Sequence, residues 1–235
     1  MKKAVAALIL MAGVIAGCAP PPPPTGPAAE VPAGFPAQRY QAAAARGEPV
    51  FRIDPARSLV VVEVRRAGAL ARLGHDHVVA SHDVQGYVAP TEGRADLYAP
   101  LGLLVVDEPA LRAEAGFDTQ PTADDIAGTR RNMLTRVLEV ERYPDVLVAV
   151  SDGTAGADAA ADVAITLHGI TRTTRIPLRI ENGSDGIVVT GGVALTQSEF
   201  GITPLSILGG AIQVADEIKL RLQIRARRCV AQTCR

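Results

Sequence analysis

Polar and apolar residues alternate along most of the chain after residue 50. The clearest case is the segment from Ile218 to Arg225, where Ile, Leu, Leu and Ile alternate with Lys, Arg, Gln and Arg. A period of two predicts a β-strand with one buried and one solvated face. The same reasoning predicts strands over residues 58–66, 78–88, 101–106, 146–150, 163–167, 176–180 and 187–195.

One stretch follows the period of a helix instead. Thr122 and Asp125 have the spacing of a capping box, which marks a helix start. The apolar residues that follow fall on one helical face and predict an amphipathic helix ending before Pro144. These residues are Ile126, Met133, Leu134, Val137 and Leu138.

Turn signals separate the predicted strands, as at His168-Gly169 and Asn182-Gly183. Short turns imply antiparallel pairing, and closure into a barrel removes exposed sheet edges. We therefore predict an all-β fold, an antiparallel barrel of about eight strands with one inserted helix; a β-sandwich is the alternative. Aromatic residues make up only 3% of the chain and tryptophan is absent. An aliphatic lining follows, and it suits an aliphatic chain better than a sugar or nucleotide.

The N-terminus has the pattern of a bacterial lipoprotein. Lys2 and Lys3 precede an apolar run that is too short to span a bilayer, and Ile15-Ala16-Gly17-Cys18 matches the segment before a lipidated cysteine. We expect residues 1–17 to be a signal peptide and Cys18 to carry acyl chains such as palmitate. Ala19 favours the outer membrane, facing the periplasm. An ordinary secretory signal with a chance cysteine is the alternative.

Composition divides the rest of the chain. Residues 18–47 are rich in Pro and Ala, including the run Pro20–Pro24, and predict a semi-rigid tether. Residues 48–228 are left as one folded domain, and residues 229–235 as a C-terminal tail. Cys229 and Cys234 predict a disulfide in an oxidising periplasm, with two free thiols as the alternative.

Charge and motifs exclude several function classes. Loss of the two leader lysines takes the formal net charge from −1 to −3, so nucleic acid is not an expected partner. The chain has no G-x-S-x-G elbow, no H-E-x-x-H and no phosphate-binding glycine loop. We therefore expect no catalysis. Oligomeric state is not indicated.

Three of the four histidines lie close together, at His75, His77 and His82. On a strand, His75 and His77 share one side, the arrangement by which a strand can present two imidazoles to one metal. His82 has the opposite parity unless a bulge intervenes, so a third ligand is not obvious. The apolar phase of Val78 and its neighbours places His75 and His77 on the outer face or in the preceding loop, and His82 is the imidazole that could point inward. A polar loop and strand start is therefore favoured over a metal site. His168 fits a hairpin turn.

Four segments together resemble the YceI-like polyisoprenoid-binding family in their order and spacing. The resemblance implies a lipocalin-like barrel, periplasmic or secreted, that holds a long isoprenoid or fatty chain without chemical turnover. The histidine stretch departs from the family pattern. The four segments are Phe51–Ser58, Arg142–Val146, Leu167–Arg172 and Ser198–Ile202.

The leading hypothesis is non-enzymatic binding or transport of a polyisoprenoid, quinone or fatty-acid derivative by a protein attached to the membrane through its lipid anchor. No cofactor is expected apart from such a bound isoprenoid or quinone. The alternatives are a metal-binding envelope protein centred on the histidines, and an interaction module with a filled barrel. The candidate lipid-contacting residues are Leu134, Leu138, Phe200 and Ile202.

Overall fold

A computed structural model describes residues 30–154, 159–183, 186–229 and 234. The predicted signal peptide, Cys18 and residues 18–29 of the predicted tether lie outside the described residues. Residues 31–235 group into one unit, and the helices and strands below belong to it. Among the described helices, none has the length and hydropathy needed to cross a bilayer.

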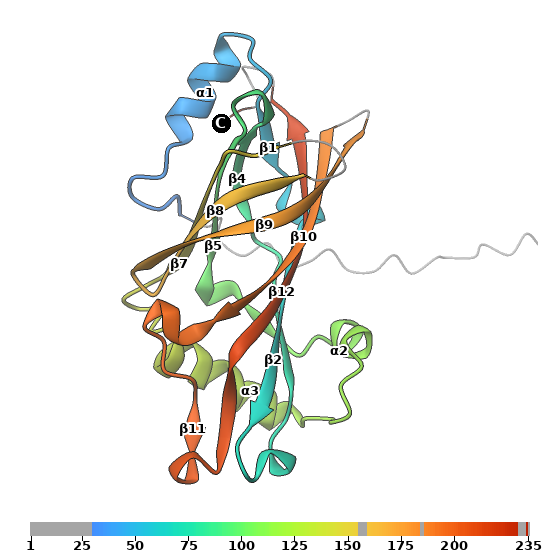
Figure 1. Ribbon diagram of the computed structural model, residues 1–235, viewed down its shortest axis with the longest axis vertical. Coiled ribbons are helices and arrows are strands. Elements are labelled where there is room, and N and C mark those ends of the chain that lie inside the picture. The colour runs from blue at the N-terminus through green and yellow to red at the C-terminus, as the bar shows by residue number, and fades with distance from the viewer. Residues whose placement is uncertain (1–29, 155–158, 184–185, 230–233, 235) are drawn as a thin grey trace, which may run out of the picture. The chain divides into compact units, whose positions relative to one another are not determined.

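Antiparallel strands form a closed barrel, which confirms the predicted fold (Figure 1). The order around the barrel is β1-β4-β5-β7-β8-β9-β10-β12, and the pairing of β1 with β12 closes it. These eight strands are β1 (Phe51–Ile53), β4 (Gln85–Ala89), β5 (Arg94–Pro100), β7 (Asp145–Ser151), β8 (Ala160–Leu167), β9 (Ile170–Gly183), β10 (Gly186–Thr196) and β12 (Ile212–Arg228).

Strand β12 is long enough to pair with different strands at its two ends. Its C-terminal end pairs with β1, whereas its N-terminal half pairs with β2 (Leu59–Ala67), which continues to β3 (His77–Ser81) and β6 (Val105–Val106). Val62 lies opposite Leu220 across this pairing. The short strand β11 (Ser206–Ile207) also pairs with β12.

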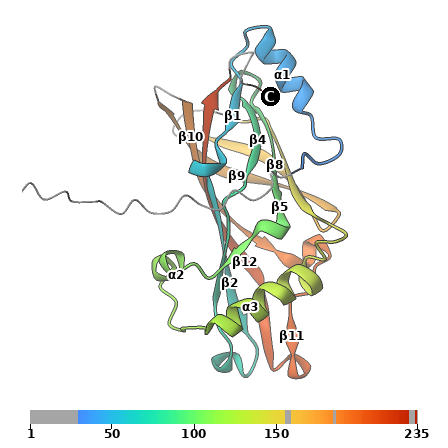
Figure 2. The same cartoon turned by 180° about the vertical axis from the view of Figure 1, so that it is seen from behind.

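The predicted amphipathic helix is present. Helix α3 (Ala123–Asn132) begins at Thr122, whose hydroxyl accepts a hydrogen bond from the Asp125 amide, while the Asp125 carboxylate accepts one from the Thr122 amide. The hydrogen bonds that the Asp125 carboxylate accepts from the Thr122 hydroxyl and amide lower the pKa of Asp125. The helix then widens into a π-helical turn over Met133–Val137. Figure 2 shows α3 in front of β12.

Two further helices cover the barrel wall. Helix α2 (Pro109–Ala115) packs through Leu111 on the outer face of β3, against Val78 and Ala80. Helix α1 (Ala37–Ala45) covers β4 near the C-terminal end of the chain. Short 3₁₀ turns complete the fold at Pro55–Arg57, Ala71–Leu73, Pro90–Glu92, Leu101–Leu103, Gln197–Phe200 and Leu208–Gly210.

The domain begins earlier than the sequence predicts. The composition predicts that residues 37–45 belong to the tether, yet they form helix α1, whose Tyr40 and Ala43 are buried against Val50 and Tyr87. The Tyr40 hydroxyl donates to Asp96 at 2.6 Å, and burial together with that hydrogen bond raises the pKa of Tyr40. The low-complexity run Ala42–Ala45 is apolar and helix-forming, so it packs instead of extending.

The predicted disulfide is present. Cys229 and Cys234 are joined and both are buried in the cluster under α1. The Tyr87 hydroxyl donates to the carbonyl of Cys234 at 3.3 Å. The predicted tail therefore closes back onto the barrel at Cys234.

Two predicted strands differ from the structure. Residues 78–88 form not one strand but β3 and β4, which pair in different parts of the sheet. The segment 101–106 begins with a 3₁₀ turn, and only Val105–Val106 is extended. His168-Gly169 does form a two-residue hairpin turn, with φ of 53° and 76°, between Leu167 and Ile170.

Candidate functional site

The barrel encloses an apolar cavity of about 290 Å³. Its wall comes from β2, β3, β5, β7, β8, β9, β10 and β12, and helix α3 contributes one side. The inward phases of β2 and β12 form a continuous aliphatic surface in this wall. That surface comprises Val60, Val62 and Val64 of β2 and Leu220, Leu222 and Ile224 of β12.

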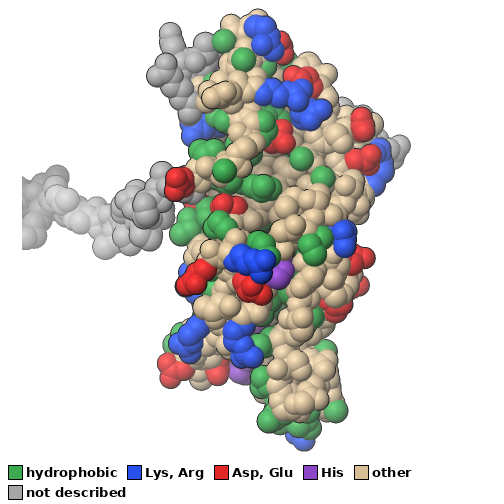
Figure 3. Space-filling view, turned by 90° about the vertical axis from the view of Figure 1, so that its left-hand side faces the viewer, with side chains coloured by type: hydrophobic (Ala, Val, Ile, Leu, Met, Phe, Trp, Pro, Cys, Tyr) green, Lys and Arg blue, Asp and Glu red, His purple; other side chains and the backbone are tan. Residues whose placement is uncertain are grey.

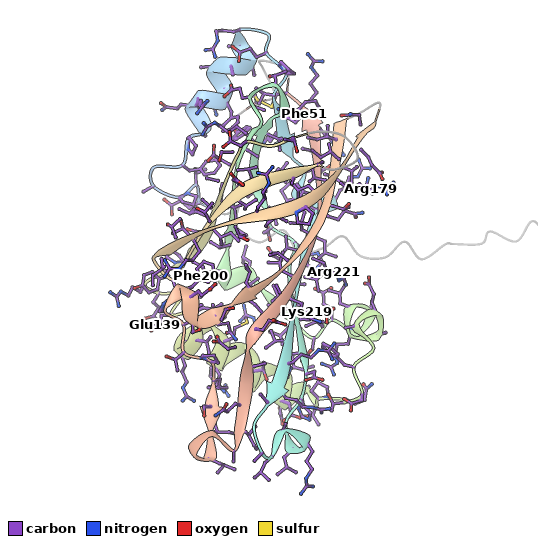
Figure 4. All side chains as sticks on the ribbon, viewed as in Figure 1. Phe51, Glu139, Arg179, Phe200, Lys219 and Arg221 are labelled. Carbon is purple, nitrogen blue, oxygen red and sulfur yellow. A yellow bond between two sulfur atoms is a disulfide. The ribbon has the colours of Figure 1, made fainter. Side chains whose placement is uncertain are left out.

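This surface follows from the sequence pattern. On β12, Leu220 faces the cavity while its neighbour Lys219 is exposed and Arg221 pairs with the exposed Glu114 at 2.8 Å. Figure 4 labels Lys219 and Arg221 on this strand. The alternation that predicted β12 therefore also predicts which of its residues line the interior. Valines and leucines dominate, and a hydrocarbon chain could be buried here without leaving polar groups unpaired.

Helix α3 and its π-helical turn contribute part of the lining. Met133, Val137 and Leu138 line the cavity, so the structure places the candidate Leu138 there. Leu134 is not in the lining, because the wider π-helical turn rotates it out of the predicted stripe. Met133, which the sequence placed on the same helical face, takes that position instead.

Phe200 and Ile202 lie elsewhere. Both are almost fully buried, at 2% and 3% exposure, and pack in the core cluster around Ala161 and Val163 instead of lining the cavity. Phe200 ends the Gln197–Phe200 turn, and Ile202 follows Gly201, which caps that turn with a φ of 70°. Gln197 lines the cavity, and its side-chain amide donates to the Ala215 carbonyl at 2.8 Å. These two candidates therefore belong to a core cluster that shares Val163 with the cavity lining, but they do not line the cavity themselves.

Only a few polar side chains interrupt the described lining. Tyr98 borders the cavity, but Leu97 and Ala99 take the inward phase of β5, and the buried Tyr98 ring packs against the Phe35 ring with centroids 4.8 Å apart. Burial, with a smaller contribution from Tyr87, raises the pKa of Tyr98, so the phenol is neutral at physiological pH. The other polar lining residues are His77, Ser81, Thr129 and Gln197.

His77 faces the cavity, and this corrects the predicted orientation of the histidines. The apolar phase of Val78 and Ala80 predicts His77 on the outer face or in the preceding loop and His82 inside. Helix α2 covers the outer face of β3, so Val78 and Ala80 are buried under that helix, and the opposite phase of His77, Val79 and Ser81 lines the cavity. Both faces of β3 are buried, and the apolar pattern alone could not distinguish them.

The structure does not bring the three histidines together. The exposed His82 pairs with Glu108 at 2.7 Å, whereas the ring centroids of His75 and His77 lie 6.1 Å apart. Among the described residues, no group of three or more His, Cys, Asp and Glu side chains is arranged to hold a metal ion. No observation in this part of the chain favours the metal-binding alternative over the apolar cavity.

A buried ion-pair network holds His77 instead. Its Nδ1 lies 2.5 Å from Oδ2 of Asp107, whose side chain has no exposed surface. The other carboxylate oxygen accepts from the Val78 amide at 3.1 Å and from Arg112 at 2.6 Å. Burial alone would raise the pKa of Asp107, but the hydrogen bonds from His77, Arg112 and the Val78 amide outweigh it and lower that pKa.

Sequence reasoning missed Asp107, Arg112 and Thr129. Asp107 is 30 residues from His77, and they meet because Val79 of β3 pairs with Val106 of β6. That pairing has no local sequence signal, since β6 is two residues long. In contrast, the alternation of apolar and polar residues around Glu63 is sufficient to predict which valines of β2 face the cavity.

His168 has the structural role that the sequence predicts. Its ring lies against Tyr143, with centroids 4.4 Å apart, and its Nε2 is 3.4 Å from Glu139. A Cβ added at Gly169 would lie 2.8 Å from the same Tyr143 ring, so this hairpin tip packs closely on the segment after α3.

A family model now accounts for this barrel. The YceI-like domain matches residues 51–226, three quarters of the chain. The chain belongs to the YceI-like domain family. The sequence resemblance is thereby confirmed, and the match begins at β1 and ends within β12.

Solved structures share the YceI-like fold at low sequence identity. One is described as a polyisoprenoid binding domain from Saccharophagus degradans implicated in plant cell wall breakdown; it has 11% identity, a TM-score of 0.53, and covers 76% of this chain and 98% of its own. Another is BcnA of Burkholderia cenocepacia, with 14% identity, a TM-score of 0.51, and coverage of 74% and 98%. No curated protein matches the sequence. These likenesses establish the fold.

Proposed function

We propose that this YceI-like protein binds and carries a long-chain amphiphile in the periplasm, without chemical turnover, from a lipid anchor in the outer membrane. The observation that carries the proposal is the aliphatic cavity inside the barrel. The expected ligand class is a polyisoprenoid, a quinone with a prenyl tail, or a fatty-acid derivative. The polyisoprenoid-binding domain with the same fold supports this class.

Burial of hydrocarbon supplies the driving force. Each methylene removed from water contributes about 0.8 kcal/mol, so ten methylenes contribute about 8 kcal/mol before the chain and protein are ordered. Ordering and loss of translational freedom offset a large part of this. The cavity also argues against a barrel filled by its own side chains.

The function is tested by titrating the full-length protein with a fluorescent polyene fatty acid and displacing it with unlabelled geranylgeraniol. We expect saturable binding of one probe per chain and full displacement. Non-saturable fluorescence that the unlabelled chain does not displace would contradict a carrier function.

The anchor is tested at Cys18. The Cys18→Ala chain should no longer incorporate labelled palmitate, and it should no longer fractionate with the outer membrane, because a multiply acylated cysteine anchors stably and an unmodified residue does not. The matched control is Cys229→Ala with Cys234→Ala, which should keep the label. Palmitate incorporation into the Cys18→Ala chain would show that the acyl chain is attached elsewhere, and no incorporation into the wild-type chain would show that there is no acyl anchor.

A further inference from the structure

The aliphatic cavity has one polar pair contributed by two separate elements. His77 comes from β3 and Thr129 from α3, and both line the cavity. The distance between His77 Nε2 and the Thr129 hydroxyl oxygen is 3.4 Å, longer than the 2.7–3.2 Å typical of a strong hydrogen bond. The two groups are therefore only weakly paired with each other, and a polar atom of a ligand in the cavity could bind both.

The imidazole is fixed in orientation. Asp107 lies 2.5 Å from Nδ1, and Arg112 and the Val78 amide hold the carboxylate from the other side. Arg112 is itself fixed by the carbonyls of Asp76 and Thr119, each at 2.6 Å. An ionised carboxylate accepts the Nδ1–H hydrogen bond, so in the neutral ring Nε2 is an acceptor with its lone pair on the cavity side.

The charges around His77 indicate which kind of ligand group can form a hydrogen bond with Nε2. The negative charge of Asp107 and the positive charge of Arg112 compensate each other within the wall. An additional charge in an aliphatic cavity would carry a large desolvation cost, whereas a neutral donor that meets a neutral acceptor would not. A carbonyl or ether oxygen would face the Nε2 lone pair without a proton between them.

We propose that His77 Nε2 accepts a hydrogen bond from a hydroxyl head group, so that the protein selects long-chain alcohols or phenols over the same chains without that proton. The Thr129 hydroxyl donates to the oxygen of that head group, and the tail occupies the aliphatic part of the cavity. This inference rests on the proposed carrier function and specifies its ligand.

The test compares geranylgeraniol with geranylgeranyl methyl ether, which differ by the hydroxyl proton. Each of the two compounds is used to displace the polyene probe from the full-length protein in detergent solution. Each measured affinity is corrected for the partition of the compound into the detergent. We expect the alcohol to bind about tenfold more tightly, the size of effect of one buried hydrogen bond. The His77→Phe chain should bind both equally, and the control His82→Phe, changed at an exposed histidine, should keep the preference.

Equal affinities in the wild type would overturn the hydroxyl inference while leaving the carrier function in place. A tenfold preference that persists in a folded His77→Phe chain would also overturn it. Binding of neither chain would overturn the carrier function as well. The wild-type comparison needs no substitution, so the inference stays testable if His77→Phe fails to fold.

Discussion

Replacing Asp107 with asparagine should lower the free energy of unfolding by about 3–5 kcal/mol, the usual cost of removing one partner from a buried ion pair. Asp107 has a fully buried side chain between His77 and Arg112, and the substitution leaves Arg112 without its counter-charge. Asparagine tolerates the positive φ of 59° at this position, so backbone strain does not enter. Urea denaturation followed by circular dichroism measures the change.

Glu114→Gln is the control, because Glu114 forms an exposed ion pair with Arg221 and its loss should cost less than about 1 kcal/mol. The pH dependence gives a second check. Because the pKa of Asp107 is lowered in the folded state from a usual 3.8, its stabilising contribution is complete above that value and is lost as pH falls through the folded pKa. The stability difference between the wild-type and Asp107→Asn chains should therefore be complete above pH 3.8 and should shrink only as pH falls below that value through the folded pKa, and equal stability at pH 7 would refute the network.

The second large effect is expected from Leu220→Trp. Leu220 lies in the middle of the cavity wall, between Val62 of β2 and Val193 of β10, and all three face the interior. An indole at this position occupies the space that the ligand chain needs, so affinity for the polyene probe should fall at least tenfold. The barrel should remain folded, because the added volume enters a cavity and not a packed core.

Lys219→Trp is the matched control. It introduces the same side chain one residue earlier on β12, where the position is exposed, and it should bind the probe as the wild type does. If Leu220→Trp does not fold, Val62→Phe on the neighbouring strand β2 narrows the same part of the cavity. Wild-type affinity in a folded Leu220→Trp chain would place the ligand outside the cavity.

Most strands could be predicted because one face of each is exposed to solvent. On β12, β8 and β10 the alternation of apolar and polar residues marks the inward phase, and the structure follows it. The prediction of orientation failed on β3, where helix α2 buries the outer face as well. Two buried faces give a continuous apolar run, which period-two reasoning cannot orient.

The candidate site could be predicted only where its residues belong to such local patterns. Leu138 was found from the helical stripe, although the π-helical turn displaces Leu134 from the same stripe. The His77–Asp107–Arg112 network depends on a pairing between β3 and a two-residue strand, and that pairing is set by the packing of α2. Long-range pairing of this kind has no signature in a single sequence.

Surface charge is consistent with a small-molecule carrier. On the face in Figure 3, basic and acidic side chains are interspersed with hydrophobic ones, so this face offers no continuous basic surface for nucleic acid. The formal net charge of −1 likewise gives no indication of nucleic-acid binding, so the interior of the barrel is the candidate binding site.

The most direct measurement is mass spectrometry of organic extracts from the full-length protein, purified from the cell envelope in parallel with its Leu220→Trp variant. Solvent extraction releases bound lipid and leaves covalently attached acyl chains on the protein, so the anchor does not interfere. The proposed function predicts one long-chain species at close to one molecule per wild-type chain and a strongly reduced amount in the variant. A wild-type chain without such a species, or equal amounts in both, would contradict it.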